Sequence, residues 1–143
     1  MPRKVLVPID ESERSTAALE FALETHPEAT IVALHVIDPS DFPMGGIEAG
    51  AATELERFRE DRVERAEELL GNAAELAAEA GVDLETVTET GRPSRTIVSY
   101  AEENDADHIV MGSHGRTGAS RILLGSVAEA VTRRSSVPVT IVR

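Results

Sequence analysis

Short apolar or β-branched runs alternate with longer segments of helical periodicity, and this alternation restricts the fold more than any other feature. The strand-like runs are Val5–Ile9, Ala29–Val36, Val82–Thr90, His108–Met111 and Val137–Val142. Helices are expected between them: after Ser12, from near Thr53 to Ala80, from Pro93 to Asn104, and from Gly125 to Arg134. Repeated strand–helix alternation predicts an α/β protein with a parallel sheet, and we expect a single domain over residues 1–143.

Capping residues and apolar periodicity support the boundaries and faces of the helices. Ser12 is expected to cap the first helix, because its hydroxyl can accept from a free N–H of the first turn. The apolar stripe of this helix is expected to include Ala18, Phe21, Ala22 and Thr25. Gly81 follows the long second helix, at the position where a glycine commonly ends a helix.

Composition excludes several classes of function. The chain has 143 residues and no cysteine, which removes disulfide frameworks, thiolate metal sites and cysteine nucleophiles. Its 26 acidic and 14 basic residues give a formal net charge of −12, so nucleic acid and anionic membranes are unsuitable partners. No apolar stretch approaches the roughly 18 residues of a membrane span, and we expect a cytoplasmic protein. The acidity fits either a salt-rich cytoplasm or an ordinary solvated surface.

A glycine-rich stretch before the last expected helix carries the strongest functional signal. It fits the pattern G-x2-G-x9-G-[ST], with Gly112, Gly115, Gly125 and Ser126 at the fixed positions. Glycines allow backbone N–H groups to approach a phosphate closely. Gly125 and Ser126 also begin a helix, whose amino end favours an anion. The stretch therefore favours phosphate binding over a turn that serves packing alone.

The charges around this stretch agree with a bound anion. Glu129 is the only acidic residue after position 107, whereas His114, Arg116 and Arg121 lie inside or next to the glycine pattern. A local surface without carboxylates can accept a small anion even though the whole chain is acidic.

Three other classes of phosphate chemistry are excluded. A P-loop needs G-x-x-x-x-G-K-[ST], and the single lysine of the chain is Lys4. No G-x-G-x-x-G follows a strand, so the usual dinucleotide fingerprint is missing. A phosphorylated receiver needs an aspartate at the end of the third strand and a later lysine, but here that strand ends in Glu89-Thr90-Gly91.

Four segments together resemble the ATP-binding subgroup of the universal stress protein family. They are Val5-Leu6-Val7-Pro8-Ile9-Asp10, Leu34-His35-Val36-Ile37-Asp38, Gly91-Arg92-Pro93 and the stretch from Met111 to Ser126. The resemblance covers almost the whole chain and is weakest between residues 39 and 80. It implies a single doubly wound five-stranded parallel sheet of order 3-2-1-4-5, with two helices on each face and an adenine nucleotide alpha hydrolase-like fold.

The resemblance also implies a nucleotide site at the carboxyl ends of the first and fourth strands, where the direction of winding changes. By matching positions, the phosphates and ribose fall to Gly112, Gly115, Gly125 and Ser126, and the adenosine contacts fall to Pro8, Asp10 and Val36. His114 and Arg116 complete the predicted nucleotide-binding set. Asp10 has a second interpretation, as a cap of the helix that follows Ser12, and the two roles can coexist. Mg²⁺ would accompany a triphosphate through phosphate oxygens and water.

Two hypotheses about function remain open. In the first, the protein is a small cytoplasmic regulator of the stress response that binds ATP and forms a homodimer through Val137–Val142. That segment is expected to be an apolar edge strand, which is ready to pair. No catalytic machinery is evident, so any ATP hydrolysis is expected to be slow. In the second hypothesis, the protein is a nucleotide-independent homodimeric scaffold for protein partners, and its glycine loop is vestigial.

Other polar residues are expected to serve packing or the surface. His26, His35 and His108 show no metal-ligand spacing. Four arginines of the long helix interleave with acidic residues, which is typical of an exposed helix face with salt bridges; they are Arg57, Arg59, Arg62 and Arg65.

Overall fold

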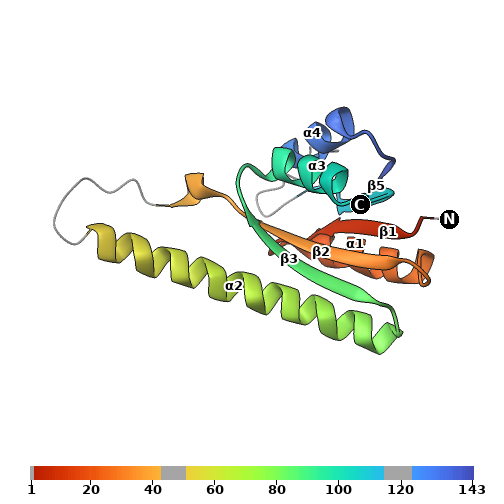
Figure 1. Ribbon diagram of the computed structural model, residues 1–143, viewed down its shortest axis with the longest axis horizontal. Coiled ribbons are helices and arrows are strands. Elements are labelled where there is room, and N and C mark those ends of the chain that lie inside the picture. The colour runs from red at the N-terminus through yellow and green to blue at the C-terminus, as the bar shows by residue number, and fades with distance from the viewer. Residues whose placement is uncertain (1, 43–50, 115–123) are drawn as a thin grey trace.

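Five parallel strands form one sheet in the order β3-β2-β1-β4-β5, which confirms the expected doubly wound topology (Figure 1). The computed structural model describes residues 2–42, 51–114 and 124–143. The strands are β1 (Lys4–Pro8), β2 (Thr30–Ile37), β3 (Leu84–Thr90), β4 (His108–Gly112) and β5 (Val139–Val142). The helices are α1 (Glu13–Thr25), α2 (Ala51–Ala80), α3 (Pro93–Glu103) and α4 (Ser126–Arg134), with a 3₁₀ turn, η1 (Pro39–Asp41). Among the described residues, no helix has the length and apolarity needed to cross a bilayer.

Two helices cover each face of the sheet, as expected. Successive side chains of β1 point to opposite faces, so Val5 and Val7 pack with buried residues of α1 and α2. Leu6, between them, packs on the other face with Ile97 of α3 and Val131 of α4. All three β1 residues are fully buried, because a parallel sheet between two helical layers has no solvent-facing side.

Two predicted helix boundaries are confirmed: the start of α1 and the end of α2. The Ser12 hydroxyl accepts from the Ser15 N–H at 3.2 Å, so Ser12 caps α1. Gly81 ends α2 with φ of 69°, a left-handed conformation that suits glycine. Val82 then donates its N–H to the Ala77 carbonyl at 3.0 Å, which closes the last turn. For this reason β3 begins at Leu84 and not at Val82.

The predicted apolar stripe of α1 is wrong at two positions. Phe21 is 37% exposed, and Thr25 is also exposed. The stripe that faces the sheet runs instead through Ser15, Ala18, Leu19, Ala22 and Leu23. Ser15 is buried because its hydroxyl donates to the Asp10 carbonyl, and this contact fixes the rotation of the helix.

The last strand is shorter than its apolar run. Val137 lies in a turn in which its N–H donates to the Ser135 hydroxyl at 3.1 Å and its carbonyl accepts from that hydroxyl at 2.8 Å. Strand β5 therefore begins at Val139. It lies at one edge of the sheet, beside β4 alone.

Strands β1 and β4 separate toward their carboxyl ends. Their register contains only the pairs Val5–His108 and Leu6–Ile109. Beyond that point β1 stays with β2, because Ile9 donates its N–H to the Leu34 carbonyl at 2.8 Å. The helix after β1 packs on one face of the sheet and the helix after β4 on the other, so a ligand crevice is expected outside the carboxyl ends of these strands.

Gly112, the last residue of β4, lies against the first turn of α1. A Cβ atom at this position would stand 2.8 Å from both the carbonyl carbon and the Cβ of Arg14. These distances are below the contact limit, so a side chain here would force the strand and helix apart. The glycine therefore has a packing role that does not depend on any ligand.

Two glycine-to-alanine substitutions separate this packing constraint from the effect of glycine on backbone entropy. Gly112→Ala is expected to lower the free energy of unfolding by about 1–3 kcal/mol, because of overpacking against Arg14. Gly71→Ala is the matched control: Gly71 lies in α2 with no atom near an added Cβ. It is expected to raise the free energy of unfolding by about 0.5–1 kcal/mol. Urea unfolding followed by circular dichroism measures both, and a Gly112→Ala protein as stable as wild type would contradict the close approach.

Candidate functional site

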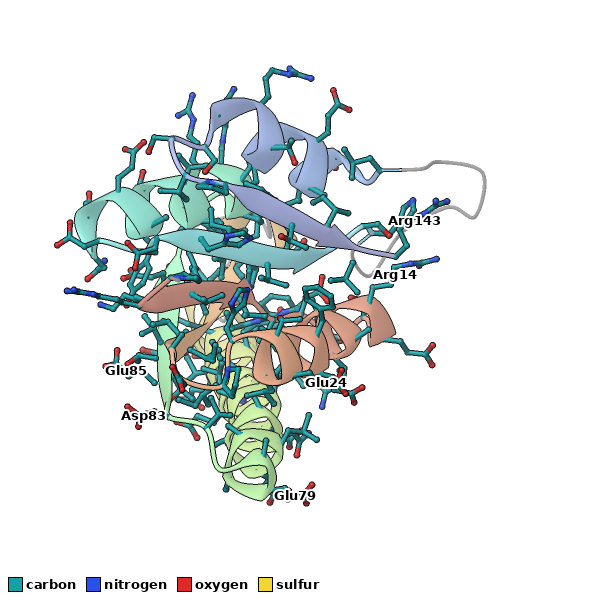
Figure 2. The ribbon with its side chains drawn as sticks, turned by 90° about the vertical axis from the view of Figure 1, so that its right-hand side faces the viewer. Arg14, Glu24, Glu79, Asp83, Glu85 and Arg143 are labelled. Atoms are coloured by element: carbon teal, nitrogen blue, oxygen red, sulfur yellow. The ribbon has the colours of Figure 1, made fainter. Side chains whose placement is uncertain are left out.

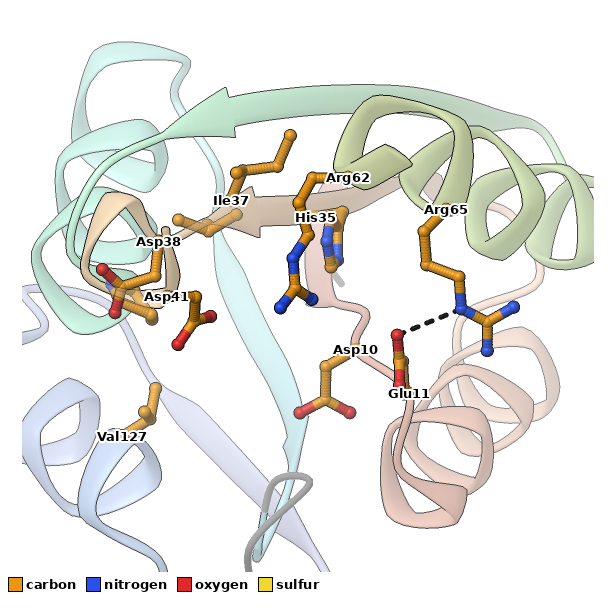
Figure 3. Close-up of a pocket in the computed structure, with 11 residues that line it drawn as sticks. Asp10, Glu11, His35, Ile37, Asp38, Asp41, Arg62, Arg65 and Val127 are labelled. Carbon is orange, nitrogen blue, oxygen red and sulfur yellow. Dashed lines mark hydrogen bonds and ion pairs between the residues drawn. The ribbon is translucent and has the colours of Figure 1, made fainter. Parts of the chain in front are cut away.

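A pocket of about 260 Å³ lies at the carboxyl end of the sheet (Figure 3). Its walls come from the segment after β1, the end of β2, η1, α2, and the first residues of α3 and α4. Five of the lining residues, one from each wall other than η1, are Asp10, Val36, Arg62, Pro93 and Val127. The pocket therefore lies beyond the carboxyl ends of β1 and β2.

Asp10 lines the pocket and also organises the start of α1. Its Oδ1 atom accepts hydrogen bonds from the N–H of Ser12, at 2.8 Å, and from the Ser12 hydroxyl. The Asp10 N–H lies 3.2 Å from the Ser15 hydroxyl. The predicted capping role of Asp10 is thus present. The Oδ1 atom is occupied by this turn, whereas the other carboxylate oxygen can accept a hydrogen bond from a ligand.

His35 is fixed in one orientation on the floor of the pocket. Its Nδ1 atom lies 2.7 Å from the carbonyl oxygen of Ile9. A carbonyl can only accept, so Nδ1 carries the proton and Nε2 of the neutral ring is an acceptor. The same contact ties β2 to the segment after β1, so His35 both shapes the pocket and offers it an acceptor.

Two arginines of α2 enter the pocket with different partners. Arg65 donates to Glu11 at 3.0 Å and to Glu68 at 2.8 Å. The hydrogen bond to Glu11, followed by that to Glu68, raises the pKa of Arg65 above its ordinary value. The Arg62 guanidinium has no carboxylate partner among the described residues and lies 4.8 Å from the centre of the Phe58 ring.

Short hydrogen bonds hold the start of α4 beside the ends of two strands. Gly125 donates its N–H to the Ser113 carbonyl at 2.6 Å, and Ser113 donates its N–H to the Val142 carbonyl at 2.9 Å. No side chain caps α4 within the described residues, and its first intrahelical bond comes from Glu129 N–H. The N–H groups of the first turn begin at Ser126, and they face the end where an anion is stabilised by the helix dipole.

Positive side chains gather at the same end of the sheet. Figure 2 shows Arg14 and Arg143 near one another where β5 ends, whereas Glu79, Asp83 and Glu85 lie toward the opposite part of the molecule. Arg14 is also the residue against which Gly112 packs. Arg14 and Arg143 thus place two positive charges near the carboxyl end of β5.

The predicted site residues divide into three groups. Asp10 and Val36 line the pocket itself. Pro8, Gly112, His114, Gly125 and Ser126 lie at the ends of β1, β4 and α4 but do not line it. Gly115 and Arg116 lie outside the described residues.

The structure gives His114 and Gly125 specific local roles. The His114 side chain is buried, with Nδ1 3.1 Å from the Ser113 hydroxyl. The Gly125 N–H is already bonded to Ser113, so this glycine shapes the turn, and Ser126 is the first residue whose N–H can face an anion.

Sequence reasoning missed several pocket residues. Arg65 is exposed and paired with Glu68, as expected of a charged helix face. His35 has the expected packing contact, with the Ile9 carbonyl. Both residues nevertheless also line the pocket, as does Arg62, and this was not predicted. Asp38 and Asp41, around η1, also line it. Pro39 favours a turn here but does not indicate that Asp38 and Asp41 line a pocket.

The other two histidines pack at the opposite end of β4. The rings of His26 and His108 lie 5.6 Å apart, and His108 Nε2 is 2.7 Å from the Thr140 hydroxyl. Burial, and then the neighbouring His26, lower the pKa of His108. Among the described residues, no group of three or more His, Asp or Glu side chains is placed to hold a metal ion.

Taken together, these groups suit a ligand with a polar nucleoside-like part and an anionic part. The pocket offers apolar surface at Val36 and Val127, acceptors at Asp10 and His35, and a donor at Arg62. The neighbouring turn of α4 offers backbone N–H groups.

Comparison with known proteins agrees with this fold. The model of the universal stress protein family matches residues 1–143. Universal stress protein MJ0531 from Methanocaldococcus jannaschii is 38% identical over 143 residues, covering 99% of this chain and 82% of that protein. The solved structure of MJ0577, from the same organism, has a TM-score of 0.83 at 32% identity, covering 98% of this chain and 94% of that one. A universal stress protein solved in complex with cAMP has a TM-score of 0.71 at 27% identity, covering 99% of this chain and 97% of that one.

Proposed function

Because the chain belongs to the universal stress protein family, we propose that its carboxyl-end crevice binds an adenine nucleotide, and that this nucleotide is ATP. The observation that carries the proposal is one cavity with Asp10 from the end of β1, Val36 from the end of β2 and Val127 from the first turn of α4. These elements meet where the sheet changes its direction of winding, which is the usual ligand position in doubly wound folds. The relative in complex with cAMP supports an adenine ligand.

Each part of the nucleotide has matching groups. Val36 offers apolar surface and its backbone to the base. Pro8, the last residue of β1, is the second proposed contact of the base. The carboxylate oxygen of Asp10 that does not bond Ser12 accepts from a ribose hydroxyl. The phosphates take the amino end of α4 at Ser126 and the turn at Gly112 and Gly125, together with His114 and the sequence positions Gly115 and Arg116.

In this proposal, Mg²⁺ binds together with the triphosphate of ATP. Mg²⁺ keeps most of its water ligands and binds through phosphate oxygens, so it requires no cluster of carboxylates from the chain. The carboxylates of Asp38 and Asp41 in the pocket wall are compatible with a hydrated cation nearby.

In this proposal, the protein is a cytoplasmic regulator that acts in the stress response and does not depend on fast catalysis. Occupancy of the crevice would change the surface around the start of α4, because the Gly125–Ser113 and Ser113–Val142 bonds link that turn to the edge strand β5. A partner protein would then recognise the occupied or the empty form.

One observation favours the alternative, a scaffold that needs no nucleotide. Gly112 is required by its packing against Arg14, and Gly125 has its N–H bonded inside the protein. Both glycines therefore have structural reasons to be present, and they would persist in a protein whose phosphate site is vestigial.

Calorimetric titration with ATP and Mg²⁺, at low and at molar KCl, separates the two functions. The test variant is Val127→Phe, which fills the pocket, and the control is Val63→Phe, at a residue of α2 that is 43% exposed. We expect saturable binding in wild type and in the control, and a loss of roughly 10-fold or more in Val127→Phe. Absence of ATP binding at both salt concentrations, in folded and nucleotide-free wild type, would leave the scaffold.

We further propose a homodimer that pairs through β5, within the predicted segment Val137–Val142. The carbonyls of Pro138 and Val142 accept from Ile109 of β4 at 3.0 Å and from Ser113, just after β4, at 2.9 Å. The alternating residues Val139 and Ile141 therefore direct their backbone groups away from the sheet. An edge of this kind is ready to pair with a second copy.

Sedimentation analysis tests the dimer. Ile141→Pro removes an outward N–H without breaking the β4–β5 ladder, and it is expected to shift the protein to monomer. Ile141→Val keeps the N–H and serves as the control, which should sediment as wild type does. A monomeric wild type, or a dimer that Ile141→Pro leaves intact, would contradict pairing through this edge.

A further inference from the structure

Of the two arginines that line the pocket, Arg62 is the one without an ion pair to a described residue. The other pocket arginine, Arg65, bonds Glu11 and Glu68. Arg62 lies in the same pocket as Asp10 and Asp38, yet it forms no ion pair with any described residue. A partly buried guanidinium that enters a pocket without an ion-pair partner can donate hydrogen bonds to an acceptor of the ligand.

An aromatic stack holds Arg62 in place. Its guanidinium carbon lies 4.8 Å from the centre of the Phe58 ring, and Phe58 meets Phe42 edge to face at 5.2 Å. Arg59 covers Phe42 at 5.7 Å on the other side of the pair. The stack links the end of η1 to α2 and reduces the number of positions that the Arg62 side chain samples. The orientation of Arg62 is thus prepared before a ligand arrives.

Arg62 lies opposite the helix end proposed to bind phosphate. In Figure 3, Arg62 and His35 lie side by side, and Val127 of α4 stands across the pocket from them. His35 presents an acceptor, because its Nδ1 proton is directed to Ile9. A donor and an acceptor together match the ring nitrogens, amino group and hydroxyls of a nucleoside, whereas phosphate offers acceptors alone.

We propose that Arg62 is a ligand-binding residue that donates to the nucleoside half of the bound nucleotide. This inference rests on the proposed function and adds α2 to the binding site. It assigns the contact to the base or ribose and not to the phosphates.

The test compares two arginines of the same stack. Arg62→Met removes the donor in the pocket, and Arg59→Met removes an equal charge one turn away on the same helix, from a residue that does not line the pocket. Each variant loses one cation–π contact, so their thermal unfolding temperatures without ligand are expected to fall by similar amounts. Calorimetry with ATP, AMP and adenosine then gives the dissociation constants of the variants and of wild type.

We expect Arg62→Met to weaken all three ligands by a similar factor, roughly 10- to 100-fold, and Arg59→Met to leave them within about twofold of wild type. A loss that grows with the number of phosphates would assign Arg62 to the phosphates and overturn the inference. Equal affinities of Arg62→Met and wild type would also overturn the inference. In that case the binding of ATP to wild type would still support the proposed function. If wild type bound none of the three ligands, both would fall.

Discussion

The change in the direction of winding between β1 and β4 is the constraint on which the rest of the site depends. The two strands share only the pairs Val5–His108 and Leu6–Ile109, and β1 then follows β2. The helix after β1 lies on one face of the sheet and the helix after β4 on the other, which leaves the strand ends between them for a ligand. At this end of the sheet Asp10 turns into the start of α1, and Gly112 meets Arg14.

The site combines a rigid frame with groups that remain available. Backbone hydrogen bonds join Gly125 to Ser113 and Ser113 to Val142, which ties the start of α4 to the edge strand. Asp10 and His35 each use one polar atom inside the protein and present the other. Because one polar atom of each side chain is already bonded inside the protein, the orientation of the side chain is fixed before a ligand binds. Binding therefore costs little conformational entropy at these residues.

The family resemblance predicted the sheet order and the helices on each face, and both are confirmed. The strands could be placed because buried parallel strands are continuous apolar runs, such as Val5–Ile9. The rotation of α1 could not be predicted, because Ser15 is polar by type and is buried only through its bond to the Asp10 carbonyl. Such a contact between a loop carbonyl and a helix residue leaves no periodic signal.

The pocket was predicted only in part, for a similar reason. Asp10 and Val36 follow directly from the strand ends, whereas Arg62 enters the pocket from a helix of 30 residues with many charged positions. Its place depends on where α2 crosses the sheet and on the stack with Phe58 and Phe42. Helical spacing indicates which residues share a face, but it does not indicate which turn of a long helix lies over the crevice.

The measurement that tests the account most directly is a nuclear magnetic resonance titration of the ¹⁵N-labelled protein with ATP and Mg²⁺. A nucleotide in the crevice predicts that the largest shifts of backbone amides occur at Asp10, Val36, Ser126 and Val127, at the ends of β1 and β2 and the start of α4. Amides at the other end of the sheet, such as those of Lys4 and His108, should change little. Shifts confined to residues of α1 and α2, or no saturable shifts, would contradict a nucleotide site at the strand ends.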